Sequence, residues 1–307
     1  TLRYTRRMTD PTSAADDVAD LRLTLPDGRT LAYTLCGIEG GQPLLRIPGT
    51  PGCRWSIRSD RSLWLARNLR AITTERPGFG ASTRLPGRGF AEHSDDLARL
   101  LDHLGLERVH VIGGSGAGPH IVSLCGRHPD RVRAATVLVG ITPLQEREID
   151  AMIPVNAATW RAVAAGDRAA AEAVIRPVWE VMVHDPLSAF EGIMASAPPD
   201  DLEILHDPAF LSGFERASRE AVAVGIDGWI DENFAIAGDW ADVDPAAVAC
   251  SLTWYHAAGD RNCPITAAQR LVAQIPGARF VEWPTEVGHF HGFRHEGEIL
   301  DELLARG

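Results

Sequence analysis

The sequence lacks the cysteine patterns that stabilise small secreted domains or bind zinc. Its five cysteines are an odd number, stand far apart and form no Cys-x-x-Cys pair: Cys36, Cys53, Cys125, Cys250 and Cys263. This spacing gives no support to a disulfide framework or a zinc finger. We therefore expect free thiols in a reducing compartment and predict a cytoplasmic protein.

Long apolar runs and excess positive charge are also missing. No stretch of about 18 apolar residues occurs, so we expect no transmembrane helix. The arginines at the start of the chain are not followed by an apolar segment, so a secretory signal is not expected. With 30 basic and 41 acidic residues the net charge is −11, which argues against nucleic acids and anionic membranes as partners.

What remains is the composition of an ordinary globular protein, with 45% hydrophobic residues in 307. This length corresponds to one large domain or to one domain with an insertion. We expect a loosely ordered leader at residues 1–20, a core formed by residues 21–142 and 245–307, and an inserted helical cap at residues 143–244. No internal repeat or low-complexity segment interrupts this division.

Strands and helices alternate through the predicted core. The apolar patterns predict strands at Leu21–Leu25, Thr30–Leu35, Pro43–Ile47, Arg70–Thr74, Val109–Ile112, Arg131–Val139, Ser251–Ala257 and Arg279–Trp283. They predict helices at Asp60–Leu69, Phe90–Leu104, from the glycine-rich turn to His128, at Ile265–Ile275 and at the end of the chain to Leu304. The order predicts an α/β protein with a mostly parallel, eight-stranded sheet covered by helices on both faces.

The predicted cap is rich in alanine and carries scattered aromatic residues: Trp160, Trp179, Phe190, Phe210, Phe214, Trp229, Phe234 and Trp240. We expect most of these side chains to pack the cap helices together, because aromatic residues supply much of the buried area of a small core. A minority would then face a cleft and form an apolar pocket.

The most informative stretch is Val109–His120, where an apolar strand ends in Gly113-Gly114-Ser115-Gly116-Ala117 and a helix follows. A tight strand-to-helix turn holds its central serine clear of the backbone as a nucleophile, and its outer positions must be small. A glycine-rich phosphate loop is the alternative. The Walker loop requires a lysine that this stretch lacks, and the glycine spacing does not fit a dinucleotide fingerprint.

A serine nucleophile needs a base, and the base needs an orienting acid. In sheets of this type the chain order is serine, acid, histidine. Ser115, Asp260 and His289 have this order, and each follows a predicted strand. Alternative acids are Glu146, Glu148 and Asp150. His256 ends a strand and is expected to be a packed residue or one that supports the site from behind. A metal site at His289, His291 and His295 is disfavoured because no carboxylates cluster with them.

Two backbone N–H groups should bind the oxyanion formed during acyl transfer. One is expected from Gly116, beside the nucleophile. The other should come from the loop Pro48-Gly49-Thr50-Pro51-Gly52, where proline cannot donate, and Thr50 is the expected donor.

From about Leu21 to Leu304 the chain resembles the α/β-hydrolase superfamily. The matching segments are Pro48–Gly52, Arg76–Ser82, Gly113–Gly116, Gly259-Asp260 with Pro264, and Gly288-His289. These segments are similar to those of the cap-bearing group that includes esterases, proline iminopeptidases, C–C bond hydrolases and cofactor-free haloperoxidases. Two positions depart from the usual pattern, namely Pro48 where the oxyanion loop usually opens with histidine, and Ala117 in the turn. Ser115 disfavours the relatives that use an aspartate nucleophile.

The resemblance implies a serine hydrolase that cleaves a small carboxylic ester, lactone, thioester or amide through an acyl-Ser115 intermediate. Asp260 and His289 would complete the triad, and Thr50 and Gly116 would form the oxyanion hole. No cofactor or metal is expected, and the partner is a small, partly apolar substrate. Use of the same triad for lyase, cyclase or C–C cleavage chemistry stays open, as do a non-catalytic ligand-binding role and a homodimer formed through the cap.

Overall fold

The computed structural model describes residues 18–57, 61–195 and 197–306 and contains an eight-stranded sheet in the order β1-β2-β4-β3-β5-β6-β7-β8. Most of the predicted leader lies outside these residues, and its last two positions belong to the first strand. The strands are β1 (Ala19–Thr24), β2 (Thr30–Gly37), β3 (Gln42–Ile47), β4 (Leu69–Thr74), β5 (Val109–Gly114), β6 (Val132–Leu138), β7 (Ser251–Ala257) and β8 (Arg279–Trp283). All eight predicted strands are present.

The sheet is parallel except at one side. β1 pairs antiparallel with β2, and β2 pairs antiparallel with β4. All pairings from β4 through β3, β5, β6 and β7 to β8 are parallel. The carboxyl ends of β3, β5, β7 and β8 therefore lie along one edge, and the loops that follow them carry the predicted site residues.

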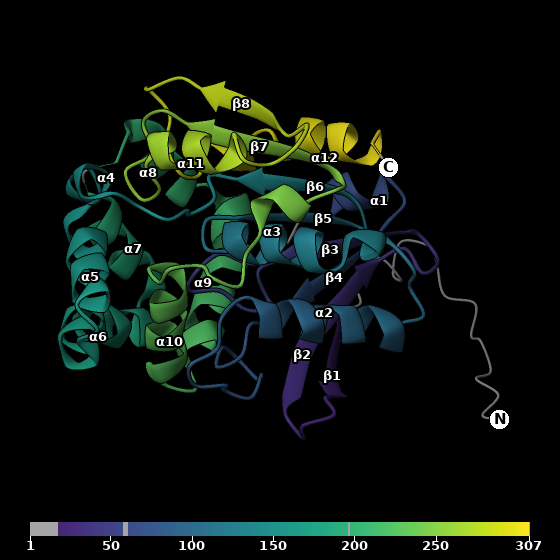
Figure 1. Cartoon of the computed structure of the whole chain (residues 1–307), viewed down its shortest axis with the longest axis horizontal. Coiled ribbons are helices and arrows are strands. Elements are labelled where there is room, and N and C mark those ends of the chain that lie inside the picture. Colours follow the sequence, from purple (N-terminus) through teal and green to yellow (C-terminus); the bar gives the residue numbers. More distant parts are fainter. Residues whose placement is uncertain (1–17, 58–60, 196, 307) are drawn as a thin grey trace.

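Helices cover both faces of the sheet, as Figure 1 shows. Successive strand residues point to opposite faces. Leu45 belongs to the apolar cluster that includes residues of α2 (Ala91–His103), α3 (Ala117–Arg127) and α11 (Ile265–Val272). Its neighbour Leu44 belongs to the cluster that includes residues of α1 (Ser62–Leu65) and α12 (Glu296–Leu304). Both residues are fully buried. The prediction of a sheet covered on both faces is confirmed.

One predicted helix is wrong in extent. Helical spacing predicts a helix over Asp60–Leu69, of which residue 60 lies outside the described residues, but α1 covers Ser62–Leu65 only. The chain leaves the helical conformation at Asn68, whose φ is 51°, and Leu69 already begins β4. Leu69 is fully buried, so its apolar character comes from the sheet core and not from a helix face.

Between β6 and β7 the chain forms a helical segment that we call the insertion (residues 143–244). Its helices are α4 (Glu146–Asp150), α5 (Pro154–Ala164), α6 (Arg168–His184), α7 (Pro186–Met194), α8 (Pro199–Leu205), α9 (Pro208–Val222) and α10 (Asp227–Ile236). They gather on one side of the sheet (Figure 1). In the part of the chain described here, none of the helices combines the length and apolar character needed to span a bilayer.

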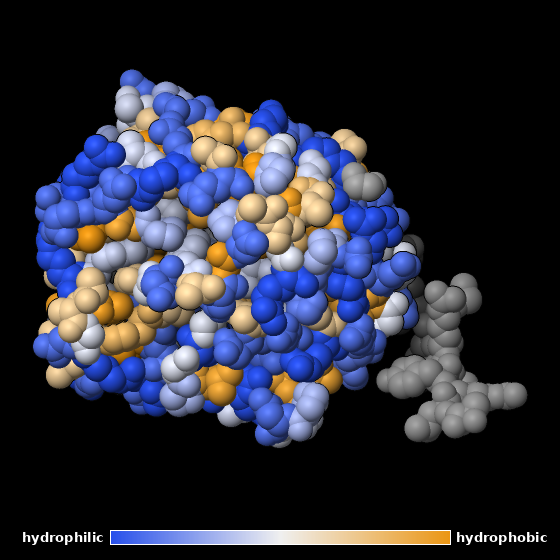
Figure 2. Space-filling model, viewed as in Figure 1, coloured by the Kyte–Doolittle hydropathy of each residue, from blue (hydrophilic) through white to orange (hydrophobic). Residues whose placement is uncertain are grey.

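On the face shown in Figure 2, apolar side chains are dispersed among hydrophilic ones. Among the described residues, Val181 and Val224 are the large hydrophobic residues that stand exposed. The homodimer therefore stays a prediction.

Candidate active site

Ser115 occupies a strained turn at the carboxyl end of β5. Its φ is 57°, a left-handed conformation that is uncommon for residues other than glycine. The turn is held by the Ser115 N–H, which donates to the Leu138 carbonyl, and by the Ser115 carbonyl, which accepts from Gly118 and Ile141 at 3.0 Å each. These hydrogen bonds stabilise the strained conformation of Ser115, and this conformation directs the serine side chain out of the sheet.

The turn also requires the small residues that the sequence offers. A Cβ atom at Gly113 would lie 2.4 Å from the Ile47 carbonyl oxygen and 2.7 Å from the Ala117 Cβ. Both distances are shorter than real Cβ contacts, so glycine is needed at position 113. Ala117 is fully buried against this glycine. The departure from the usual pattern at Ala117 is thus accommodated by this turn.

Asp260 and His289 are hydrogen bonded at 2.7 Å between Oδ2 and Nδ1. Because a carboxylate only accepts, Nδ1 carries the proton and Nε2 is left as the acceptor. Burial lowers the pKa of His289, but the charge and hydrogen bond of Asp260 and the charge of Asp201 raise it above its ordinary value overall. Burial raises the pKa of Asp260, and His289 holds it below its ordinary value.

The alternative acids lie in other interactions. Glu148 pairs with Arg270 at 2.6 Å, and both Glu146 and Asp150 pair with Arg161. His256 is buried and hydrogen bonds to the Cys263 carbonyl at 2.7 Å, as expected of a packed residue.

Cys263 lies beside the Asp260–His289 pair. The ligand atoms of Asp260, Cys263 and His289 lie within 4.8 Å of one another, and within the described ranges this is the group with spacing suited to a metal ion. Two of its three members already bond to each other. Burial raises the pKa of the Cys263 thiol well above its usual value, and Asp260 raises it further against a smaller lowering by Ser115. This group therefore consists of a hydrogen-bonded aspartate–histidine pair with a thiol beside it.

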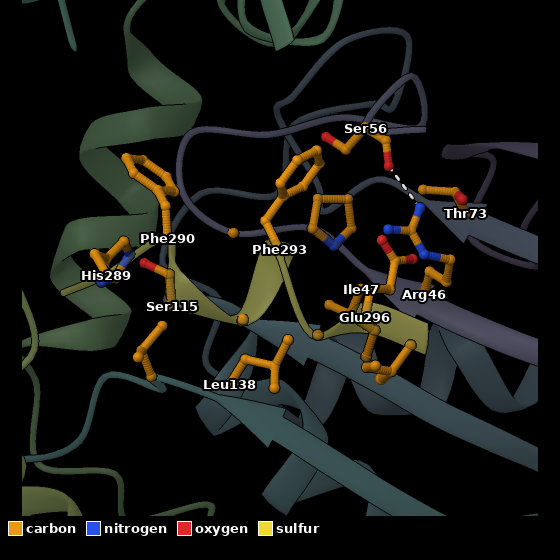
Figure 3. Close-up of a pocket in the computed structure, with 17 residues that line it drawn as sticks. Arg46, Ile47, Ser56, Thr73, Ser115, Leu138, His289, Phe290, Phe293 and Glu296 are labelled. Carbon is orange, nitrogen blue, oxygen red and sulfur yellow. Dashed lines mark hydrogen bonds between the residues drawn. The ribbon is translucent and has the colours of Figure 1, made fainter. Parts of the chain in front are cut away.

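Two cavities meet at Ser115 and His289. The larger, of about 330 Å³, contains Thr50 and Gly116. The smaller, of about 270 Å³, extends along β3 (Figure 3). In that view the Ser115 hydroxyl points toward the His289 ring at one end, and Arg46, Thr73 and Glu296 lie at the other. In the described part of the chain, Ser115 Oγ forms no hydrogen bond with His289.

The aromatic residues of the insertion line the larger cavity more extensively than expected. Five of the eight named above do so: Trp160, Phe190, Phe210, Phe214 and Trp229. Phe214 shows how both roles combine, because its ring contacts Phe190 and Phe210 at centroid distances of 4.6 and 5.0 Å and also faces the cavity. The expectation that only a minority face the cleft is wrong.

Thr50 and Gly116 adjoin one another in the larger cavity. A Cβ atom at Gly116 would lie 3.2 Å from the Thr50 nitrogen, and both residues line the cavity with Ser115. Neither N–H donates a hydrogen bond to any group in the described ranges. The two donors are thus available beside the serine, which is the arrangement that an oxyanion hole requires.

The loop Pro48–Gly52 is held by side chains whose role was not predicted from the sequence. Arg76, fully buried, donates to the Pro48 carbonyl, to the Gly49 carbonyl at 2.6 Å and to Thr50 Oγ1 at 3.0 Å. Its counter-ion is Glu232 of α10, at 2.9 Å from Arg76 Nε. Pro48 has no side-chain hydrogen-bonding group, so an arginine from the loop after β4 holds this segment instead.

Glu232 connects the insertion to the core through several partners. It pairs with Arg88 as well as Arg76, accepts from Thr50 Oγ1 at 3.2 Å and contacts His120 Nε2 at 3.1 Å. Burial raises the pKa of Glu232, but the two arginines hold it well below its ordinary value. A single ionised carboxylate of the insertion is therefore the shared counter-ion of two buried arginines beneath the Pro48–Gly52 loop.

The sheet order and the strand-to-helix turn at Ser115 are those of the α/β-hydrolase fold. Residues 42–174 match the family described as alpha/beta hydrolase fold. Over 116 residues the chain is 32% identical to the uncharacterized hydrolase YcgS of Bacillus subtilis, an alignment that covers 38% of this chain and only 40% of that relative.

Solved structures of similar fold match this chain over a greater share of its length than the sequence relative does. An enol-lactonase from Burkholderia xenovorans LB400 is 17% identical with a TM-score of 0.64, covering 93% of this chain and 100% of the other. An esterase from Exiguobacterium antarcticum is 19% identical with a TM-score of 0.64, covering 92% and 97%. At these identities the likeness concerns the fold. The chain therefore has the α/β-hydrolase fold, and its residues 42–174 match the family model of that fold.

Proposed function

We propose that the protein is a serine hydrolase that cleaves a small carboxylic ester, lactone, thioester or amide through an acyl-Ser115 intermediate. The observation that carries the proposal is the left-handed Ser115 at the mouth of two cavities that it shares with His289, itself bonded to Asp260 at 2.7 Å. The enol-lactonase and esterase with similar folds support the choice of an acyl substrate.

In the proposed mechanism Ser115 Oγ attacks the substrate carbonyl carbon while its proton passes to His289 Nε2. The carbonyl oxygen becomes an oxyanion and accepts from the Thr50 and Gly116 N–H groups. The tetrahedral intermediate collapses, and His289 returns the proton to the leaving alcohol, thiol or amine. Water, deprotonated by His289, then attacks the acyl carbon and releases the acid. Asp260 keeps the proton on His289 Nδ1 throughout.

The larger cavity favours a neutral substrate. Its walls are aromatic and aliphatic side chains together with the amides Asn156, Asn233 and Asn262, and among the described lining residues only Cys263 and His289 can titrate. An ammonium or carboxylate group placed there would lose its hydration without gaining an opposite charge. We therefore expect neutral apolar esters and lactones to be better substrates than amino-acid amides, which argues against a peptidase role.

Intact-mass measurement after treatment with a fluorophosphonate tests the nucleophile. Wild type should gain one adduct, because a serine activated by a base and facing an oxyanion hole attacks phosphorus as it attacks a carbonyl. Ser115→Ala should gain none and should lose ester turnover while retaining its circular dichroism spectrum and melting temperature. Adduct formation on Ser115→Ala, or a variant with wild-type turnover, would refute the assignment of Ser115.

The acid–base alternative is tested with a slowly turned over ester. Rapid quenching and mass measurement should detect an acyl group on Ser115. Full turnover of a substrate with no acylated protein at any time would favour proton transfer by the triad without a covalent step.

A further inference from the structure

The base loop of this site is held by a carboxylate from the insertion. Asp201 lies in the first turn of α8, and its side chain is only 1% exposed. Its Oδ2 accepts the His289 N–H at 2.8 Å, and its Oδ1 accepts the Phe290 N–H at 2.8 Å. One carboxylate thus fixes two consecutive peptide groups at the residue that would act as the base.

The loop sequence is adapted to this contact. A Cβ atom at Gly288 would lie 2.2 Å from Asp201 Oδ2 and 2.7 Å from its carboxyl carbon. Any side chain at position 288 would therefore displace the carboxylate. Gly288 leaves the space that Asp201 fills, which explains the glycine before His289 without any need for an unusual backbone angle.

The contact differs from that of the acid in the triad. Asp260 binds the His289 ring, whereas Asp201 binds the His289 backbone. Asp201 belongs to α8 of the insertion and stands 88 residues before His289 in the chain. In the described ranges Asp201 forms no ion pair with an arginine, so the two N–H groups are its main compensation for burial. Burial raises the pKa of Asp201 above its ordinary value, although the hydrogen bonds from Phe290 and His289 and the charge of His289 oppose this rise. The stability of the carboxylate therefore depends on the place of the His289 loop.

We propose that Asp201 is a positioning residue for His289, through which the insertion sets the place and the proton affinity of the base. The inference rests on the proposed function, because it takes His289 as the group that accepts the Ser115 proton. Misplacement of a catalytic group by about 1 Å can lower the rate about 100-fold. Loss of the two hydrogen bonds that hold the His289 backbone should therefore lower the rate measurably.

The substitution Asp201→Asn tests the proposal, because an amide can accept from only one of the two N–H groups and carries no charge. Asp200→Asn is the matched control. Asp200 is the neighbouring acid on α8, and it pairs with His291 Nδ1 at 2.9 Å and with Arg294. We expect kcat for an ester to fall at least about tenfold in Asp201→Asn and to change little in Asp200→Asn.

A pH profile separates positioning from a general loss of stability. The titratable groups around His289 are Asp260 and Cys263 of the loop after β7, His256 of β7 and Asp201 of α8. His289 must be neutral to accept a proton, so kcat/KM rises with pH through its pKa. Loss of the Asp201 charge lowers that pKa, and the acid limb of Asp201→Asn should move to lower pH, unlike that of Asp200→Asn.

Gly288→Ala provides a second variant that keeps the charge and pushes the carboxylate off the loop. It should lower kcat as Asp201→Asn does, with a smaller shift of the acid limb. If Asp201→Asn does not fold, this variant carries the test. Equal kcat and equal acid limbs in wild type, Asp201→Asn and Gly288→Ala would overturn the proposal.

Hydrogen exchange distinguishes failure of this inference from failure of the proposed function. Amide exchange in a peptide spanning residues 285–293 should quicken in Asp201→Asn relative to wild type and Asp200→Asn, whatever reaction the protein catalyses. Wild type that takes up no fluorophosphonate would contradict the serine hydrolase. Unchanged exchange in Asp201→Asn would contradict the role of Asp201 even if wild type is labelled.

Discussion

Glu232→Gln should destabilise the protein strongly, because it removes the negative charge from a cluster that holds two buried guanidinium groups. Arg76, Arg88 and Glu232 all have side chains with no exposed surface. The carboxylate lies 2.9 Å from Arg76 Nε and contacts Arg88 directly. In the variant the amide keeps the shape of the side chain, but both arginines lose their counter-ion.

The magnitude follows from the cost of an uncompensated buried charge. Unit charges about 4 Å apart attract by about 4 kcal/mol at an effective dielectric constant of 20. Removal of one partner from a buried pair typically costs about 3–5 kcal/mol. An unfolding entropy of about 2.1 cal/mol/K per residue gives about 0.6 kcal/mol/K for 307 residues, so the melting temperature should fall by about 5–8 °C.

Urea unfolding followed by fluorescence, together with calorimetry, measures both quantities. Asp227→Asn is the control, since Asp227 starts the same helix, is 56% exposed and pairs with Arg84 and Arg168. An exposed pair is worth less than about 1 kcal/mol, so this variant should unfold nearly as wild type. A Glu232→Gln variant no less stable than Asp227→Asn would refute the view that the buried arginines depend on this carboxylate.

Two further outcomes follow from burial. Burial lowers the pKa of His120 to about 4, so unfolding takes up a proton between about pH 4 and 6.5. The free energy of unfolding should therefore fall by about 3 kcal/mol as the pH falls through that window. Urea titrations should show a shallower fall in His120→Gln, and parallel pH profiles of the two proteins would contradict this account. A hydrogen bond from Cys125 lowers the pKa of Cys250, whereas the pKa values of the other four thiols are raised. A thiol reagent such as DTNB should therefore modify Cys250 first. A fast phase of modification that persists in Cys250→Ser would show that another thiol reacts first.

The sheet and its site residues could be predicted because they depend on local patterns and chain order. Apolar runs identify strands, and the parallel sheet then brings their carboxyl ends to one edge. Ser115, Asp260 and His289 each follow such a run. Ser115 and His289 line the same cavity, and the buried Asp260 bonds the histidine ring. The helix predicted from residue 60 failed because Leu69 satisfies a helical spacing and a strand equally well.

The supporting contacts could not be predicted, because they join residues far apart in the chain. Asp201 and His289 are 88 positions apart, and Arg76 and Glu232 are 156 apart in the printed numbering. Nothing near Asp201 or Glu232 in the sequence differs from an ordinary acidic residue on a helix. Gly288 is a local sign of the Asp201 contact, because the missing side chain leaves room for the carboxylate. The sequence alone does not identify which residue fills that room.

The two carboxylates of the insertion affect how proteins with this fold can be recombined. Glu232 reaches the oxyanion loop and Asp201 reaches the base loop, so each half of the proposed catalytic centre depends on a helix outside the sheet. Replacing residues 143–244 with the corresponding segment of another hydrolase would remove both supports, even if the new segment folded well and brought an excellent binding pocket. A chimera designed for a new substrate would have to carry Asp201, Glu232 and their helix positions across the junction.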